Sequence, residues 1–205
     1  MKKIIAFVVL MLAAFSIYWF LLKTKDSKPA AEEQVPIAVR THSDSFNVAV
    51  KNVLDAYYNM KDAFVEADTA LVKQHAQLFK SRLDSIPLAE LEKDKKAIFE
   101  TVKMNIGELQ TNATALVAQT DITEMRYNFR TISDMLYPGF FKTINYEGPT
   151  VYLQNCPMAF DGDKDANWIS NSNEVVNPYL GKKDPTYKAG MLHCGEVKDS
   201  LVTGF

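Results

Sequence analysis

A chain of 205 residues, of which 47% are hydrophobic, is long enough to bury its own core and fits one domain with a small appendage. Its formal net charge of −2, without a cluster of Lys or Arg beyond the N-terminal apolar segment, argues against a nucleic-acid or polyphosphate partner. The two cysteines, Cys156 and Cys194, permit either one disulfide in an exported protein or a pair of soft metal ligands.

The first 22 residues carry an apolar segment. Lys2 and Lys3 precede the uncharged run 4–22, whose length at about 1.5 Å per residue is close to the bilayer core thickness. This pattern predicts a membrane helix with the two lysines in the cytoplasm. A cleaved signal peptide is the alternative, because the run offers small residues at 12–14, although it is longer than a usual signal sequence. Both interpretations place the soluble domain in the periplasm, either anchored to the inner membrane or secreted.

A polar linker over 23–43 is expected to lead into a helical bundle over 44–145. Apolar residues recur there at three- and four-residue steps, and prolines or capping residues mark the ends. The expected helices cover about 44–67, 68–87, 88–118 and 121–138. Their N-cap candidates are Ser43, Asp44 and Ser45 for the first helix, Asp68 for the second and Asp121 for the fourth. Short connections between long amphipathic helices favour antiparallel neighbours.

The tail, 146–205, differs from the helical segment in composition, because Asp, Gly, Asn and Pro dominate it. The sequence of the tail suggests one short strand, over 150–153. The aromatic residues of the tail indicate that it folds against the bundle. The alternating aspartates at 161–165 are more typical of a solvated turn than of a calcium loop, which needs a Glu at its twelfth position. The predicted fold class is all-α: an antiparallel four-helix bundle with a loop-rich C-terminal appendage and an N-terminal membrane helix.

Two short clusters in the tail carry the candidate chemistry. One contains Cys156 and Met158, and the other contains Met191, His193 and Cys194, so each pairs a thiol with a thioether. Such soft ligands select Cu(I) or Ag(I), and the imidazole adds a further donor. Two thiols in all cannot build a four-cysteine zinc site, and the haem attachment motif is absent. These five residues are the candidate metal site.

A disulfide is the alternative use of the same cysteines. In an oxidising compartment Cys156 and Cys194 would close a loop of about 40 residues, which stabilises a fold by roughly 3–4 kcal/mol. Met158 and Met191 would then be core filler, because methionine packs irregular gaps well. The two states can also alternate with redox conditions.

Four tail motifs together resemble an uncharacterised bacterial envelope domain family, a domain of unknown function that joins a helical bundle to this tail. They are CPMAF at 156–160, WIS at 168–170, NPY with Gly181 at 177–181, and ML-x-CGEV at 191–197. The resemblance extends over roughly 46–197, and similar domains occur attached to periplasmic adaptor subunits of copper/silver efflux pumps. It implies Cys156, Met158, Met191 and Cys194 as metal ligands, with His193 optional. The chain departs from the family pattern in an insertion at 182–190, before Met191.

The functional hypothesis is an envelope protein that binds Cu(I) or Ag(I) for sequestration or for delivery to efflux machinery. Its expected partners are the metal ion, an efflux adaptor or another envelope protein, and the inner membrane through the N-terminal helix. The alternative is a structural or protein-interaction module with a Cys156–Cys194 disulfide and no metal. No catalytic triad, phosphate loop or convincing carboxylate pair occurs, so neither an enzyme nor another cofactor is expected.

Overall fold

The structure is a computed structural model, and it describes residues 11, 15, 18, 42–93 and 96–202. The chain divides into two compact units, Met1–Ala38 and Val39–Phe205, and the second unit contains all the elements discussed below. The predicted membrane helix, 1–22, lies outside the described residues apart from single positions. Among the helices that the structure does describe, none combines the length and the apolar character needed to cross a bilayer.

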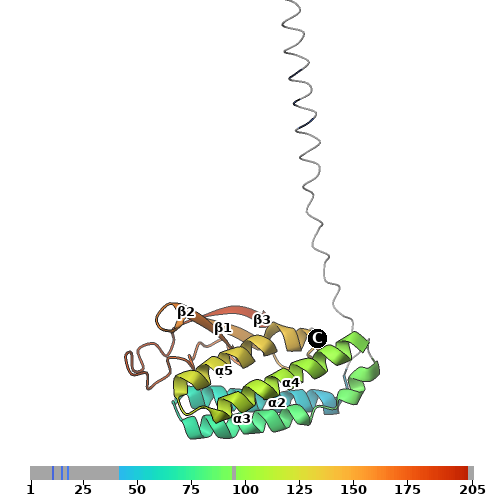
Figure 1. Ribbon diagram of the computed structural model, residues 1–205, viewed down its shortest axis with the longest axis horizontal. Coiled ribbons are helices and arrows are strands. Elements are labelled where there is room, and N and C mark those ends of the chain that lie inside the picture. Colours follow the sequence, from blue (N-terminus) through green and yellow to red (C-terminus); the bar gives the residue numbers. More distant parts are fainter. Residues whose placement is uncertain (1–10, 12–14, 16–17, 19–41, 94–95, 203–205) are drawn as a thin grey trace, which may run out of the picture. The chain divides into compact units, whose positions relative to one another are not determined.

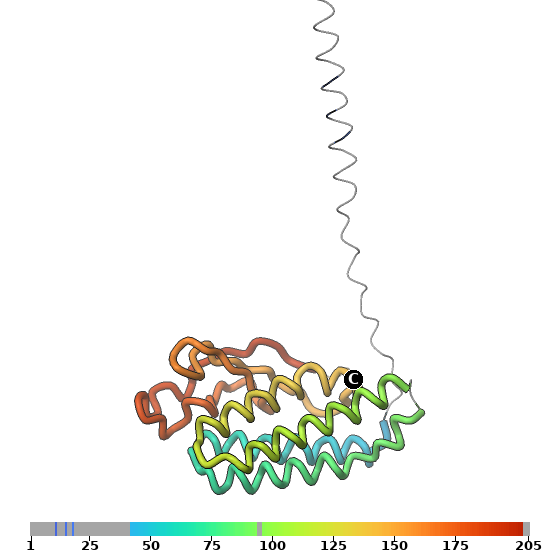
Figure 2. Tube along the Cα trace, viewed as in Figure 1, coloured from blue at the N-terminus to red at the C-terminus, as the bar shows by residue number. Residues whose placement is uncertain are grey.

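Four long helices form the N-terminal part of the second unit (Figures 1 and 2). They are α2 (Asp44–Val65), α3 (Thr69–Asp84), α4 (Lys96–Ala118) and α5 (Ile122–Asp134). Consecutive helices contact one another. Three predicted N-caps are confirmed: the side chains of Ser43, Asp68 and Asp121 accept hydrogen bonds from backbone N–H groups in the first turns of α2, α3 and α5.

Two helix predictions are only partly correct. The segment after Pro87 begins with a 3-10 helix, η1 (Leu88–Lys93), rather than with α-helix. This geometry places residues i and i+3 in one line, so Leu88 and Leu91 both face the core. The last predicted helix leaves α-helical geometry at Met135 and continues as a π-helical segment, η2 (Met135–Phe140), into the short α6 (Phe141–Thr143). Tyr137, the residue before Pro138, has non-helical φ and ψ of −118° and 128°, so the chain kinks there, as a proline predicts.

The predicted all-α fold class is wrong, because the tail contains an antiparallel sheet. Its strands are β1 (Val151–Phe160), β2 (Lys164–Ser170) and β3 (Glu196–Leu201), in the order β2-β1-β3. The turn between β1 and β2 has positive φ at Asp161 (53°) and Gly162 (79°). Asp and Gly tolerate this conformation, so the acidic segment is a hairpin turn in an α+β domain.

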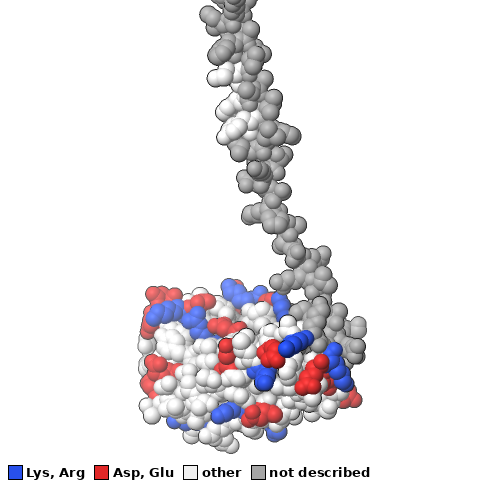
Figure 3. Space-filling model, turned by 45° about the vertical axis from the view of Figure 1, so that its right-hand side comes forward, with Lys and Arg blue, Asp and Glu red and all other residues white. Residues whose placement is uncertain are grey.

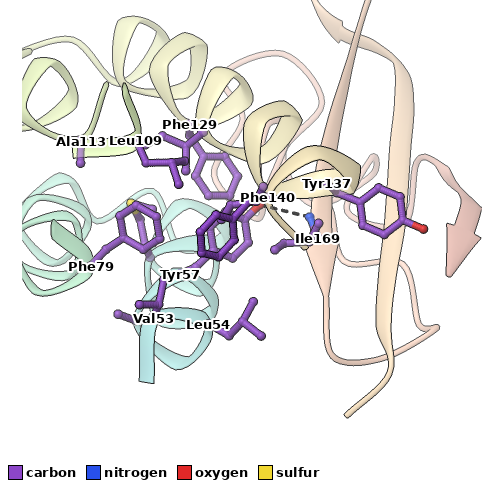
Figure 4. Packing of buried hydrophobic residues seen from close by; sticks show 14 of the residues in the cluster. Val53, Leu54, Tyr57, Phe79, Leu109, Ala113, Phe129, Tyr137, Phe140 and Ile169 are labelled. Atoms are coloured by element: carbon purple, nitrogen blue, oxygen red, sulfur yellow. Dashed lines mark hydrogen bonds between the residues drawn. The ribbon is translucent and has the colours of Figure 1, made fainter. Parts of the chain in front are cut away.

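The helices and the sheet share one hydrophobic core. Tyr57 of α2 joins them: its hydroxyl lies 2.6 Å from Ser133 Oγ of α5 and accepts a hydrogen bond of 3.1 Å from the backbone N–H of Ile169 in β2. Figure 4 shows this contact beside the rings of Phe79 and Phe129, with which Tyr57 packs. The prediction that the tail folds against the bundle is therefore confirmed.

The surface carries charges of both signs. On the face drawn in Figure 3, Lys and Arg side chains alternate with Asp and Glu side chains rather than gathering into a patch of one sign. This mixture agrees with the formal net charge of −2.

Candidate thiol and metal site

Cys156 lies in the central strand of the sheet. It belongs to β1, pairs with Ala166 of β2, and is fully buried. β1 lies between β2 and β3, and the side chain of Cys156 belongs to the buried hydrophobic cluster. The thiol therefore has a fixed position within the described part of the domain.

Cys194 reaches the same place from the other end of the tail. It precedes β3, whose first residue, Glu196, pairs with Asn155 of β1. This register places Cys194 beside Cys156, and the two Sγ atoms are 3.1 Å apart although 38 positions separate the residues. Both cysteines are free thiols in the structure. The pairing of the two sulfurs, on which both the metal and the disulfide hypotheses depend, is thus present.

Asn177 holds the loop that carries Cys194. This fully buried residue donates from Nδ2 to the carbonyl oxygen of Cys194 (2.8 Å) and from its backbone N–H to that of Leu192 (2.7 Å). Its Oδ1 accepts hydrogen bonds from the backbone N–H groups of Tyr179 and Leu180 at 2.8 and 3.1 Å. One side chain thus ties the 177–180 turn to the cysteine loop.

Gly195 lets the loop approach the sheet. Its φ is +138°, and a Cβ at this position would lie 2.6 Å from the carbonyl oxygen of Asn155 and 3.0 Å from Cη2 of Trp168. Only glycine allows so close an approach of two backbones at this position. The indole of Trp168, which is fully buried, therefore lies directly beside the thiol loop.

The two thioethers are close to the core but make no hydrogen bond with a thiol. Met158 and Met191 are both partly buried and pack against the hydrophobic cluster. Met158 follows Cys156 by two positions, which would share a face in a regular strand, but the β1–β2 register shifts between Cys156 and Phe160. Within the described residues, neither thioether sulfur accepts a hydrogen bond from Cys156 or Cys194.

His193 is exposed beside Cys194. Its Nδ1 lies 2.7 Å from the carbonyl oxygen of Val175. A carbonyl oxygen only accepts, so Nδ1 carries the proton and Nε2 of the neutral ring keeps a lone pair that can bind a metal. In the part of the chain that the structure describes, no group of three or more His, Cys, Asp or Glu residues is arranged to hold a metal ion. Met158, Met191 and His193 are the nearby residues from which an ion at the thiol pair could take a further ligand.

The environment disfavours a free thiolate at Cys194. Burial, reinforced by the hydrogen bond with Cys156 and by its charge, raises the pKa of the Cys194 thiol to about 11. The thiol is therefore protonated at neutral pH, and a bound cation must displace its proton.

Asn177 and Trp168 belong to tail motifs, but the sequence alone predicts a role for neither. For Asn177 a local signal exists, since Asn before Pro is typical of a turn in which the side chain binds the backbone two residues on. No local signal places Trp168 beside Gly195, because that contact depends on the register of β1 with both of its neighbours.

Comparison with curated proteins and with solved structures finds no match. A family model does match the helices, from Val53 in α2 to Asn145 after α6, and it ends before the sheet. None of Cys156, Met158, Met191, His193 and Cys194 lies in the matched range. The model that matches residues 53–145 is that of a protein of unknown function, DUF3347.

Proposed function

We propose that the chain is an envelope protein that binds Cu(I) or Ag(I) at Cys156 and Cys194, for sequestration or for delivery to efflux machinery. The observation that carries this proposal is the convergence of the two thiols, with Sγ atoms 3.1 Å apart, from distant parts of the tail. Two thiolates and one or two weaker donors suit a soft monovalent ion, whereas structural zinc takes four protein ligands.

The ion requires a small movement of the loop. With metal–sulfur bonds of about 2.3 Å, two thiolates bound to one ion lie roughly 3.8–4.6 Å apart, depending on the bond angle. Starting from 3.1 Å, the sulfurs must therefore separate by about 0.7–1.5 Å. Cys156 lies in the central strand, so Cys194 supplies this movement, and its loop also brings Met191 and the Nε2 atom of His193.

A competition titration with a chromophoric Cu(I) chelator, on the reduced full-length chain under anaerobic conditions, tests the proposal. We expect the native chain to bind one ion. Cys156→Ser and Cys194→Ser should each lower the Cu(I) affinity at least a hundredfold. Met158→Leu combined with Met191→Leu should lower it about tenfold, or 1.4 kcal/mol. Met104→Leu is the matched control, because Met104 is 57% exposed on α4. Unchanged affinity in either cysteine variant, or no binding by the native chain, contradicts the proposal.

The partner and the location are part of the same proposal. The resemblance to domains attached to copper/silver efflux adaptors suggests an exported protein that passes its ion to such an adaptor. An alkaline-phosphatase fusion after residue 205 should be active if the domain is exported, and an inactive fusion contradicts export. Copper transfer to an isolated adaptor, followed by elemental analysis after separation, tests delivery.

The second proposal is a structural or protein-interaction module closed by a Cys156–Cys194 disulfide. The same Sγ–Sγ contact supports it, because a modest approach of the two thiols suffices for the bond. Thiol titration and elemental analysis of natively isolated protein separate the two proposals. Two free thiols with bound copper support the metal proposal, and no free thiol with no metal supports the module.

A further inference from the structure

The two thiols differ in how a reagent can reach them. Cys156 is fully buried within the central strand, with Ala166 opposite it on β2. Cys194 is partly exposed, on the loop that precedes the exposed edge strand β3. A reagent from solution therefore meets Cys194 first, and Cys156 reacts only with what Cys194 has bound.

We propose that this pair is a redox-controlled release site, in which a disulfide reagent enters at Cys194, Cys156 completes the internal disulfide, and the bound Cu(I) or Ag(I) leaves. This inference rests on the metal-binding function proposed above and adds its regulation. It assigns an entry role to Cys194 and a closing role to Cys156.

The exchange balances as two displacements. Cys194 loses its proton and its sulfur attacks one sulfur of a small disulfide, such as oxidised glutathione, so that a mixed disulfide forms and one glutathione thiol leaves. Cys156 then loses its proton and attacks Sγ of Cys194, and the second glutathione thiol leaves. Two electrons pass from the cysteines to the reagent, which is reduced to two thiols. In the metal-loaded chain both cysteines are already thiolates, so each glutathione leaves as a thiolate and takes its proton from water. The metal keeps its oxidation state and departs because both thiolate ligands are consumed.

The geometry favours internal closure over a stable mixed disulfide. Cys156 Sγ is already 3.1 Å from the sulfur it attacks. The bond from Asn177 Nδ2 to the Cys194 carbonyl and the pairing of Glu196 with Asn155 keep both sides of the loop in register during the exchange. Holding two reactants at contact distance raises the local rate strongly over that of a reagent in solution.

Trp168 supplies an internal reporter. Its indole lies within contact distance of Gly195, the residue after Cys194, and Trp19 is the other tryptophan of the chain. In a Trp19→Phe background the fluorescence therefore comes from Trp168 alone. We expect its intensity to change on closure of the disulfide and to return on reduction.

The test treats the reduced, metal-free full-length chain with oxidised glutathione and follows the intact mass. The native chain should lose two hydrogens without keeping an adduct, Cys156→Ser should accumulate one glutathione on Cys194, and Cys194→Ser should react at least tenfold more slowly. Equal reaction of the two serine variants, or a lasting adduct on the native chain, overturns the proposal.

The metal-loaded arm separates this proposal from the proposed function. As the internal disulfide forms, an external chelator should take up one Cu(I) ion for each disulfide bond. Reduction with dithiothreitol should then restore Cu(I) binding by the protein. A chain that binds copper but keeps it while the disulfide forms overturns the release proposal alone. A chain that binds no copper overturns the proposed function, and the metal-free arm then still decides the order of closure.

Discussion

Gly195 shows how strongly one residue constrains the thiol site. Its positive φ of +138° favours glycine, and a methyl group there would meet a backbone carbonyl, which cannot turn away as a side chain can. The nearest atom belongs to Asn155, the residue before Cys156. Any shift that relieves this clash therefore changes the distance between the two cysteines.

We predict that Gly195→Ala weakens the Cu(I) binding proposed above by tenfold or more and lowers the free energy of unfolding by about 1–3 kcal/mol. The matched control is Gly107→Ala on α4, where an added Cβ meets nothing within 4 Å. This control should raise stability by up to about 1 kcal/mol, because alanine favours a helix interior. Chelator competition and urea unfolding measure the two effects. Equal stability changes in both variants would contradict the close approach at Gly195.

The site could be predicted at the level of residue type but not of geometry. Soft ligands at Cys156 and Cys194 were evident in the sequence, and their contact is present. Met158 and Met191 are spaced like ligands along the chain, and both pack against the core. For Met158, the register shift in β1 interrupts the alternation that the spacing assumes. Asn177 has a local turn signal, its bond to the N–H of Tyr179, but its bond to the carbonyl of Cys194, 17 positions away, is encoded by no local pattern.

At the scale of elements, local signals predicted the helices and missed the sheet. The N-caps Ser43, Asp68 and Asp121 bind backbone N–H groups no more than three residues further on. Such local contacts can be predicted from the sequence. β1 alternates poorly because it contains Pro157 and two buried residues in succession at its end, Ala159 and Phe160. β3 pairs with β1 across more than 40 residues of chain, and such pairing leaves no local trace.

Tyr57 connects α2 to the sheet through its hydroxyl group. Burial raises the pKa of its hydroxyl, which therefore stays neutral while it bonds to Ser133 and accepts from the N–H of Ile169. We predict that Tyr57→Phe costs about 1–3 kcal/mol of unfolding free energy, because it leaves the buried N–H of Ile169 without an acceptor.

The control is Tyr58→Phe on the same helix, since the Tyr58 hydroxyl makes none of the hydrogen bonds described here. It should change stability by less than about 0.5 kcal/mol. Urea unfolding measures both variants, and amide exchange at Ile169 should accelerate in Tyr57→Phe alone. If both substitutions cost the same, the hydroxyl of Tyr57 does not join helix to sheet.

At the scale of the whole molecule, chain segments far apart in sequence meet at the start of α2. The backbone N–H of Ser43 donates to Oε1 of Glu90 in η1 (2.7 Å), and the backbone N–H of His42 donates to Oε2 of Glu147, which follows α6 (3.0 Å). The ring of His42 is also bonded to the carbonyl oxygen of Ile144 and stacks on Phe46. Sequence analysis assigned 42 and 43 to a linker, because the partners of these residues lie roughly 50 to 100 positions away.

Glu90 makes this junction sensitive to acid. Burial by itself acts to raise the pKa of Glu90, but the hydrogen bonds from Ser43 and the nearby His42 outweigh it, so the pKa of Glu90 lies below its usual range. A carboxyl group with a lowered folded-state pKa contributes stability above its unfolded pKa and loses it as the pH falls through the folded value. We therefore predict that Glu90→Gln destabilises the domain at pH 7 by up to about 1 kcal/mol, the range of a partly exposed charged contact.

The difference between Glu90→Gln and the native chain should shrink as the pH falls below about 4.5 and vanish once the native carboxyl is protonated. Urea unfolding followed by circular dichroism from pH 7 to pH 3 measures it. Glu92→Gln, an exposed substitution in the same 3-10 helix, is the control and should change stability at pH 7 by less than about 0.5 kcal/mol. A deficit for Glu90→Gln that is as large at pH 3 as at pH 7 would mean that size or shape, rather than charge, ties the start of α2 to η1.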